Sequence, residues 1–269
     1  MLKIPNIIKI FSLALLLSGS VGCGSVPDPA FLADTQNDHK DHSGADQMKY
    51  KGLSQESAKL GWSYLAAYFN KNSFVPAINR SYIADAMQCF NWCWSFDNEN
   101  YQAYWGAGVV RGVQATFIDD RFLIEKYLKQ SVEFMLLAMK HHVPAEQINN
   151  LSLDLANSYN GLGEFYLQVS KEEFDIYKGA NAFYAQSFKK ELADTNLNSA
   201  RTILLDVIKK EPENGRAFFL LAATCFYQGK YAEAKQLAEQ SQNKHFKVPD
   251  DFLKNLSNKI AASPMLPQK

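Results

Sequence analysis

Two histidines and several aspartates near the start of the chain have the side chains best suited to metal binding. His39 and His42 are three residues apart, and Asp38, Asp41 and Asp46 lie close to them. Imidazole nitrogens and carboxylate oxygens together can hold a divalent transition metal. The surrounding stretch is polar and shows no apolar period, which favours a solvated tether that binds nothing. A weak metal site is the alternative.

The cysteines and glycines do not form a recognisable catalytic or cofactor motif. Cys89 and Cys93 are one helical turn apart, where a disulfide is sterically awkward, so we expect buried free thiols, with a bridge as the alternative. Gly106, Gly108 and Gly112 lack the spacing of a dinucleotide-binding loop and fit close packing of helices better. No G-x-S-x-G or H-E-x-x-H motif is present. The sequence therefore predicts a protein that is not an enzyme and has no cofactor.

A pattern of large and small residues recurs four times, and such a repeat sets the architecture that positions the other side chains. Each copy has an aromatic residue, an apolar residue at +3, a small residue at +4 and usually a large residue at +7. The copies are Trp62-x-x-Leu65-Ala66-x-x-Phe69, Tyr104-x-x-Ala107-Gly108-x-x-Arg111, Tyr159-x-x-Leu162-Gly163-x-x-Tyr166 and Phe218-x-x-Leu221-Ala222-x-x-Cys225. These spacings place the residues on one face of an α-helix.

A second helical pattern follows each copy and starts with a small residue. The small residues are Ala86, Ser131, Ala200 and Ala234. The step from Ala86 to Tyr104 and the step from Ala200 to Phe218 are both 18 residues. Tyr159 and Ala200 are 41 residues apart, which is long for a helical hairpin, so we expect one extra helix over Lys171 to Asp194. The sequence thus predicts four helical hairpins with unequal internal spacing.

The paired patterns resemble the tetratricopeptide repeat, a helix–turn–helix unit of about 34 residues. The resemblance covers Ser54 to Pro264 and is most specific in the third and fourth copies. It implies an all-α fold: a right-handed superhelical solenoid of about four helical hairpins with insertions, over residues 53–264. A C-terminal capping helix over Asp251 to Ala262 would cover the last hairpin. Residues 265–269 would form a tail.

In tetratricopeptide proteins the first helix of each unit lines a concave groove that binds partners. The positions that the resemblance assigns to this inner face are Leu60, Ser63, Ala67, Asn70 and Lys71 in the first copy, Gln102, Trp105, Val109, Gly112 and Val113 in the second, Asn157, Asn160, Glu164, Leu167 and Gln168 in the third, and Arg216, Phe219, Ala223, Phe226 and Tyr227 in the fourth. Aromatic and arginine side chains are frequent interface anchors. We therefore expect a partner-binding groove formed by Trp105, Val109, Glu164, Arg216, Phe219, Phe226 and Tyr227.

The first 22 residues have the composition of an export signal. Lys3 and Lys9 are basic, residues 10–17 are apolar, and small residues follow. The segment Ser20-Val21-Gly22-Cys23 resembles the bacterial lipoprotein box. That resemblance implies that residues 1–22 are a lipoprotein signal peptide and that Cys23 is acylated. An ordinary secretory signal and an uncleaved anchor are the alternatives.

The lipoprotein resemblance also implies where the protein resides. Residues 23–52 would be the lipidated cysteine and a disordered tether between membrane and folded domain. Gly24 stands where inner-membrane lipoproteins carry aspartate, so we expect a lipid anchor in the outer membrane, facing the periplasm.

The charge balance limits the classes of partner. The chain has 28 basic and 28 acidic residues, so no basic field favours a nucleic acid. The hypothesis that follows is a membrane-anchored, non-catalytic scaffold or adaptor that binds another envelope protein or peptide. The alternative is an envelope lipoprotein that binds a small ligand or a metal.

Overall fold

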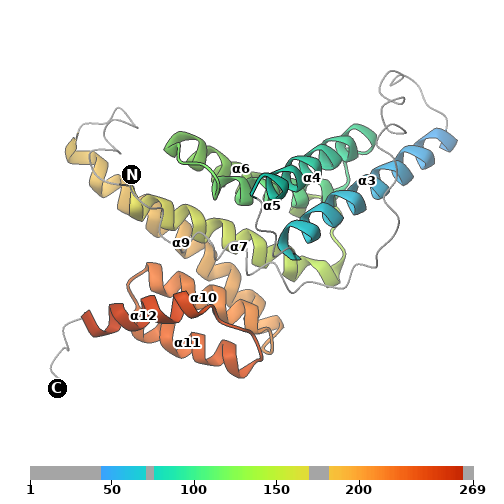
Figure 1. The fold of residues 1–269 in the computed structure, drawn as a ribbon. Helices are drawn as coiled ribbons and strands as arrows, with labels where there is room; N and C mark the ends of the chain where they lie inside the picture. Colours follow the sequence, from blue (N-terminus) through green and yellow to red (C-terminus); the bar gives the residue numbers. More distant parts are fainter. Residues whose placement is uncertain (1–43, 71–75, 170–181, 263–269) are drawn as a thin grey trace.

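The computed structural model describes residues 44–70, 76–169 and 182–262, and every regular element in these ranges is an α-helix (Figure 1). The helices are α3 (Gly44–Asn70), α4 (Pro76–Phe96), α5 (Tyr101–Ala115), α6 (Arg121–Lys140), α7 (Ala145–Gln168), α9 (Ala182–Lys210), α10 (Gly215–Tyr227), α11 (Tyr231–Asn243) and α12 (Asp250–Ala262). The predicted all-α class is confirmed for this part of the chain.

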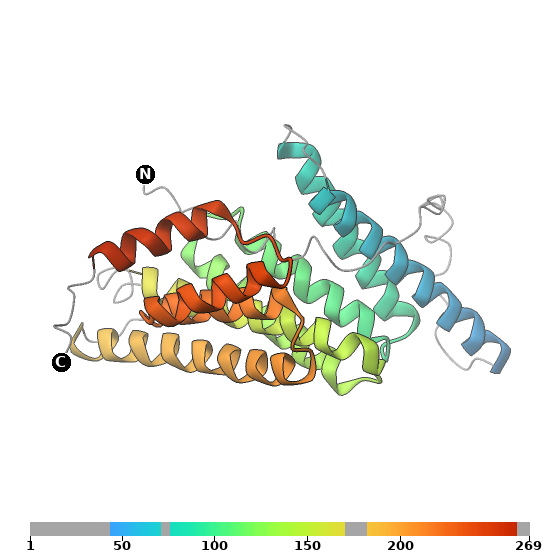
Figure 2. The same ribbon diagram turned by 90° about the horizontal axis from the view of Figure 1, so that it is seen from below.

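Helices that follow one another in sequence pack as pairs. The most extensive contacts join α3 with α4, α5 with α6, α7 with α9, and α10 with α11. The first helices of successive pairs also touch, because α5 contacts both α3 and α7, and α7 contacts α10. The pairs succeed one another in chain order from α3 and α4 at one end to α10, α11 and α12 at the other (Figures 1 and 2). Side chains on α7 can therefore reach α5 on one side and α10 on the other.

Small residues are required where paired helices approach closely. Ala86, Ser131, Ala200 and Ala234 are all 0% exposed. A Cβ added to Gly163 would lie 2.6 Å from the Leu197 side chain. The small positions of both patterns thus bring the two helices of a hairpin together, as the sequence predicted.

Local signals place the helix ends. Asp120 precedes α6, and its carboxylate accepts hydrogen bonds from the backbone N–H groups of Phe122 and Leu123. Asn214 caps α10 in the same manner by accepting from Ala217 N–H. Gly229, between α10 and α11, has a φ of 75°, a conformation that favours glycine. Asp120, Asn214 and Gly229 thus mark where α6, α10 and α11 begin.

The prediction of a separate helix over Lys171 to Asp194 is wrong for the C-terminal part of this segment. Residues 182–194 belong to α9, which continues without a break through Ala200 to Lys210. Residues 171–181 lie outside the described part of the chain. Long helices account for much of the unequal spacing, since α9 has 29 residues whereas α10 and α11 have 13 each.

The first described helix begins earlier than the sequence suggested. We expected a tether up to residue 52, but α3 starts at Gly44 and includes Asp46 in its first turn. His39, His42 and Cys23 lie outside the described residues.

The last helix covers the pair before it. Phe252 and Leu256 of α12 are each 2% exposed. The Phe252 ring lies 5.4 Å from that of Phe219 and 5.6 Å from that of Phe226, both on α10. The predicted helix over Asp251 to Ala262 is confirmed, with its start at Asp250, and it closes the apolar face of α10.

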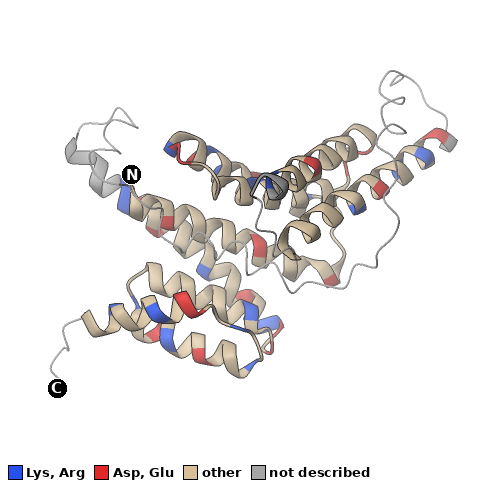
Figure 3. Ribbon diagram, viewed as in Figure 1, with Lys and Arg blue, Asp and Glu red and all other residues tan. Residues whose placement is uncertain are grey.

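Charged residues of both signs are interspersed along the helices (Figure 3). The described helices include none that combines the length and the apolarity required to cross a bilayer.

Candidate functional site

One face of α7 carries a line of five polar side chains, four of which are buried. Its members recur every three or four residues, so they share one side of the helix. They are Asp154, Asn157, Asn160, Glu164 and Gln168. The first four are between 3% and 6% exposed. Buried polar groups require hydrogen-bond partners, so the partners of this line determine what it can do.

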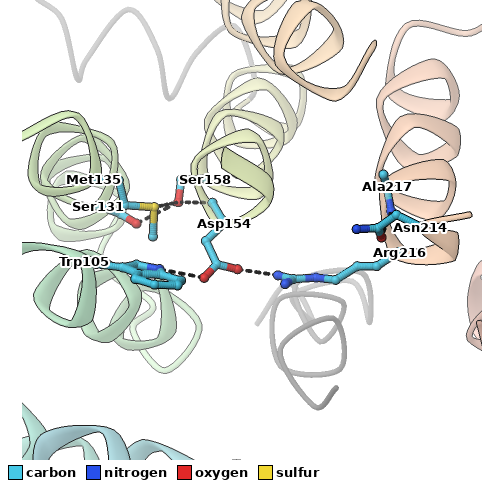
Figure 4. Close-up of polar contacts among 8 residues, drawn as sticks. All are labelled: Trp105, Ser131, Met135, Asp154, Ser158, Asn214, Arg216 and Ala217. Atoms are coloured by element: carbon cyan, nitrogen blue, oxygen red, sulfur yellow. Dashed lines mark hydrogen bonds and ion pairs between the residues drawn. The ribbon is translucent and has the colours of Figure 1, made fainter. Parts of the chain in front are cut away.

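Asp154 joins three hairpins through its carboxylate (Figure 4). Its Oδ2 accepts a hydrogen bond of 2.8 Å from Trp105 Nε1 on α5, and its Oδ1 forms an ion pair with Arg216 on α10. Trp105 and Arg216, which we expected to bind a partner, therefore direct their polar groups into the protein. Sequence analysis did not select Asp154. A signal was present, because this carboxylate stands between Leu153 and Leu155.

A neighbouring pair of hydroxyls completes this polar layer (Figure 4). Ser131 Oγ donates to the Gly108 carbonyl at 2.7 Å and lies 2.8 Å from Ser158 Oγ. Ser158 lies 3.6 Å from the Met135 sulfur and also bonds the Asp154 carbonyl. These contacts hold α5, α6 and α7 together, which makes this layer structural.

The expected groove is not open at its apolar positions. Phe219 is 0% exposed, Phe226 is 8% exposed and Val109 is 1% exposed. The Phe219 ring packs against Phe246 at 5.4 Å in addition to the α12 contact. These three residues thus belong to the core, which corrects the expectation that they face a partner. The helical period identifies the inward face but does not reveal that α12 folds back over it.

A cavity of about 30 Å³ lies farther along α7, between α5, α6, α7 and α10. A water molecule needs about 10–15 Å³ of such space, so the cavity has room for a small polar group. The positions assigned to the inner face by the repeat resemblance supply much of its lining. They are Gly112, Asn157, Asn160, Glu164, Gln168, Ala223 and Tyr227. Two of the expected partner-binding residues, Glu164 and Tyr227, therefore meet at one site.

Glu164 is the acidic group of the cavity. Its Oε1 accepts a hydrogen bond of 2.6 Å from Gln168 Nε2, and its Oε2 accepts one of 2.8 Å from Tyr227 Oη. Burial raises the pKa of Glu164 to about 7, against the lowering effect of these two bonds. Burial and the nearby carboxylate raise the pKa of Tyr227 well above its ordinary value, so Tyr227 remains a donor. The Glu164 carboxyl therefore changes charge near neutral pH.

The two asparagines of the cavity differ in their hydrogen bonds. Asn160 is satisfied, since its Nδ2 donates to the Leu220 carbonyl at 3.2 Å and its Oδ1 accepts from Thr224 at 2.9 Å. Asn157 Nδ2 has no hydrogen-bond partner, although the residue is only 4% exposed. An unmet buried donor costs about 1–3 kcal/mol. The residues that line the cavity thus include one with an unmet N–H donor, Asn157, and one with a carboxyl that can accept further bonds, Glu164.

Other reactive side chains are held in unreactive states. Cys89, Cys93 and Cys225 are buried free thiols, which confirms the expectation for Cys89 and Cys93. Burial raises the pKa of Cys89 to about 12 and that of Cys93 to about 11, so both stay protonated. Within the described ranges, no group of three or more His, Cys, Asp or Glu residues could hold a metal ion.

Comparison with known proteins gives no relative from which to transfer a function. No family model, no curated protein and no solved structure matches this chain. The tetratricopeptide resemblance therefore stays a prediction. Function must be inferred from the inner face of α7 and the cavity beside it.

Proposed function

We propose that this protein is a non-catalytic binding protein, built as a right-handed solenoid of helical hairpins similar to tetratricopeptide repeats, and that it binds through the cavity at Glu164. The observation that carries this proposal is the convergence of inner-face positions from three hairpins on one cavity. The contacts of α5 with α7 and of α7 with α10 support it, because stacked first helices are what such a solenoid requires.

The proposed partner follows from the N-terminal segment. The lipoprotein box at Cys23 supports a lipid anchor, which would keep the protein at the envelope, in the outer membrane and facing the periplasm. The partner would then be another envelope protein or a peptide, and not a nucleic acid. Labelling cells with a clickable palmitate analogue tests the anchor. Label should appear on the wild type and on Cys89→Ala, and it should be absent from Cys23→Ala; label retained by Cys23→Ala would refute acylation at this residue.

A variant that fills the cavity tests the binding site. Ala223 lines the cavity and is 2% exposed, so Ala223→Val should place two methyl groups in the space where a ligand enters. Ala232 is exposed on α11, which makes Ala232→Val a matched control. Cross-linked partners are to be recovered from solubilised envelopes with each full-length protein. We expect one partner to be recovered with the wild type and the control and lost with Ala223→Val.

Folding must be checked in the same preparation. Equal helical content by circular dichroism and equal melting cooperativity establish that Ala223→Val is folded. Undiminished recovery of the partner by a folded Ala223→Val protein would contradict binding through the cavity.

The second candidate function is small-ligand binding at the same cavity. The mostly apolar lining and the unpartnered Asn157 donor favour it, since ligand sites are largely apolar and have few, precisely placed polar groups. Native mass spectrometry of the purified full chain should then show a bound small molecule with the wild type and none with Ala223→Val. A metal-binding function would depend on His39 and His42, outside the described residues.

A further inference from the structure

We propose that the cavity beside Glu164 recognises an α-ammonium group together with the adjacent carbonyl oxygen. Free amino acids and peptide N-termini share this unit. The inference rests on the proposed function, because it assumes that the cavity is the binding site, and it specifies the ligand chemistry.

Glu164 supplies the acceptor for the ammonium group. Each oxygen of its carboxylate accepts one hydrogen bond, from Gln168 and from Tyr227, and a carboxylate can accept about four. Neither donor is a cation. Arg121 lines the same cavity but is not among the groups that set the pKa of Glu164. A buried carboxylate is favoured by an opposite charge within about 4–6 Å, which an incoming ammonium would provide.

Asn157 supplies the donor for the carbonyl. Asn157 lines the cavity and its Nδ2 has no hydrogen-bond partner, so the best ligand would bring an acceptor as well as a cation. Asn157 and Glu164 are seven residues apart, about 10 Å along the helix axis. Two hydrogen bonds of about 2.9 Å each take up more than half of that distance. The donor and the acceptor of the ligand are then only a few ångströms apart.

An α-ammonium nitrogen and its own carbonyl oxygen are about 3 Å apart from standard bond lengths, so the side chains need to lean only slightly toward each other to hold both. A simple amine would leave the Asn157 donor unmet, and a simple carboxylate would be repelled by Glu164. Ile124, Leu128 and Phe165 form an apolar part of the remaining wall. A space of about 30 Å³ admits the head of the ligand only, so the rest of an amino acid or peptide must stay outside.

Titration calorimetry on the full chain in detergent tests the ligand class with four probes. Glycinamide carries the ammonium and the carbonyl, Ala-Ala-Ala carries the same unit at a peptide N-terminus, N-acetylglycinamide lacks the ammonium, and propylamine lacks the carbonyl. We expect the last two to bind about tenfold more weakly or worse than glycinamide, because each loses a charge-assisted or buried hydrogen bond. Binding of glycinamide but not of Ala-Ala-Ala means that the site admits only a small ammonium–carbonyl ligand, and binding of Ala-Ala-Ala as well assigns the site to peptide N-termini.

Two variants test the residues. Glu164→Gln and Asn157→Leu should each weaken glycinamide binding about tenfold or more, whereas Glu239→Gln, at an exposed position on α11, should leave it unchanged. Circular dichroism and thermal melts verify that each variant is folded.

Proton release gives a readout that a purely structural role would not change. The charged residue that lines the cavity from α6 is Arg121, and the titratable residue from α10 is Tyr227, which stays protonated. The α5 side contributes Gly112, Ala115 and Thr116. At pH 6 the bound ammonium should displace the proton of Glu164, so the binding enthalpy should depend on the ionisation enthalpy of the buffer. Glu164→Gln should abolish this dependence.

Equal binding of glycinamide and N-acetylglycinamide, or no binding of either ammonium–carbonyl probe, overturns the inference. If the envelope partner is still lost with Ala223→Val in that case, the cavity remains the binding site and only the ligand class is wrong. If the ammonium–carbonyl probes do not bind and folded Ala223→Val still recovers the partner, the proposed function is overturned as well.

Discussion

Replacing Arg216 with methionine should lower the free energy of unfolding by about 3–5 kcal/mol, because it removes the counter-ion of a buried carboxylate. Asp154 is 3% exposed, and its other side-chain bond is the one from Trp105 Nε1 at 2.8 Å. Methionine keeps much of the apolar stem of arginine, so the loss reports mainly on the charge. The uncompensated carboxylate bridges α5, α7 and α10 and cannot reach water without separating them.

Urea unfolding followed by circular dichroism measures this loss, and the melting temperature should fall by about 6–20 °C. The double variant Asp154→Leu/Arg216→Met removes both charges and should recover most of the loss, since apolar replacements of buried ion pairs are often neutral. Trp105→Phe, which removes one neutral donor, should cost about 1–3 kcal/mol. A loss below about 1 kcal/mol for Arg216→Met, or a double variant that shows the sum of both single losses, would refute the role assigned to Asp154.

Three further predictions concern burial elsewhere. As the pH rises from about 4.5 to 7, the free energy of unfolding should fall by on the order of 3 kcal/mol relative to that of Glu164→Gln. The reason is that folded Glu164 keeps its proton up to a pKa of about 7, whereas the unfolded chain releases it near 4.5. Equal pH dependence of both proteins in urea titrations would contradict this. Gly106→Ala should lower the free energy of unfolding by about 1–3 kcal/mol, since the added Cβ would lie 2.0 Å from the buried Phe90 ring. Gly52→Ala, where the added Cβ meets nothing within 4 Å, should be neutral or stabilising in parallel thermal melts. Iodoacetamide at pH 8 should leave Cys89 and Cys93 unmodified in the native protein and alkylate both in urea, as peptide mass spectrometry would show; rapid native alkylation would mean that these thiols are accessible.

The features that can be predicted from the sequence are those encoded within a few residues. Asp120 and Asn214 mark helix starts because their side chains bond backbone groups two or three residues later. Gly229 marks a turn because its backbone needs a positive φ. Ala86 and Ala234 identify the close faces of hairpins because only small side chains fit there. Helix pairing and the all-α class follow from these local signals.

The features that sequence missed depend on contacts between distant residues. Whether Phe219 is open or buried depends on α12, which returns over α10 from more than thirty positions later, with Phe252 as the contact. The start of the helix that carries Ala200 could not be read from the spacing, because the apolar period continues from α9 into the preceding segment. The partners of Asp154 lie 49 and 62 residues away. No local period determines such distant pairings.

The line of polar residues on α7 separates into a structural part and the part that we propose to bind a ligand, by what its members bond. Asp154 has a cation and an indole donor, so its charge is neutralised inside the protein. Glu164, on the same face ten residues later, has only neutral donors, and Asn157 between them has a donor with no partner. An apolar pair at these two positions would avoid both the burial of an acid and the unmet hydrogen bond. A stack of helices that served only as a spacer would gain nothing from the free-energy cost of the buried acid and the unmet donor. A site that receives a ligand with one positive charge and one acceptor would offset that cost when the ligand binds.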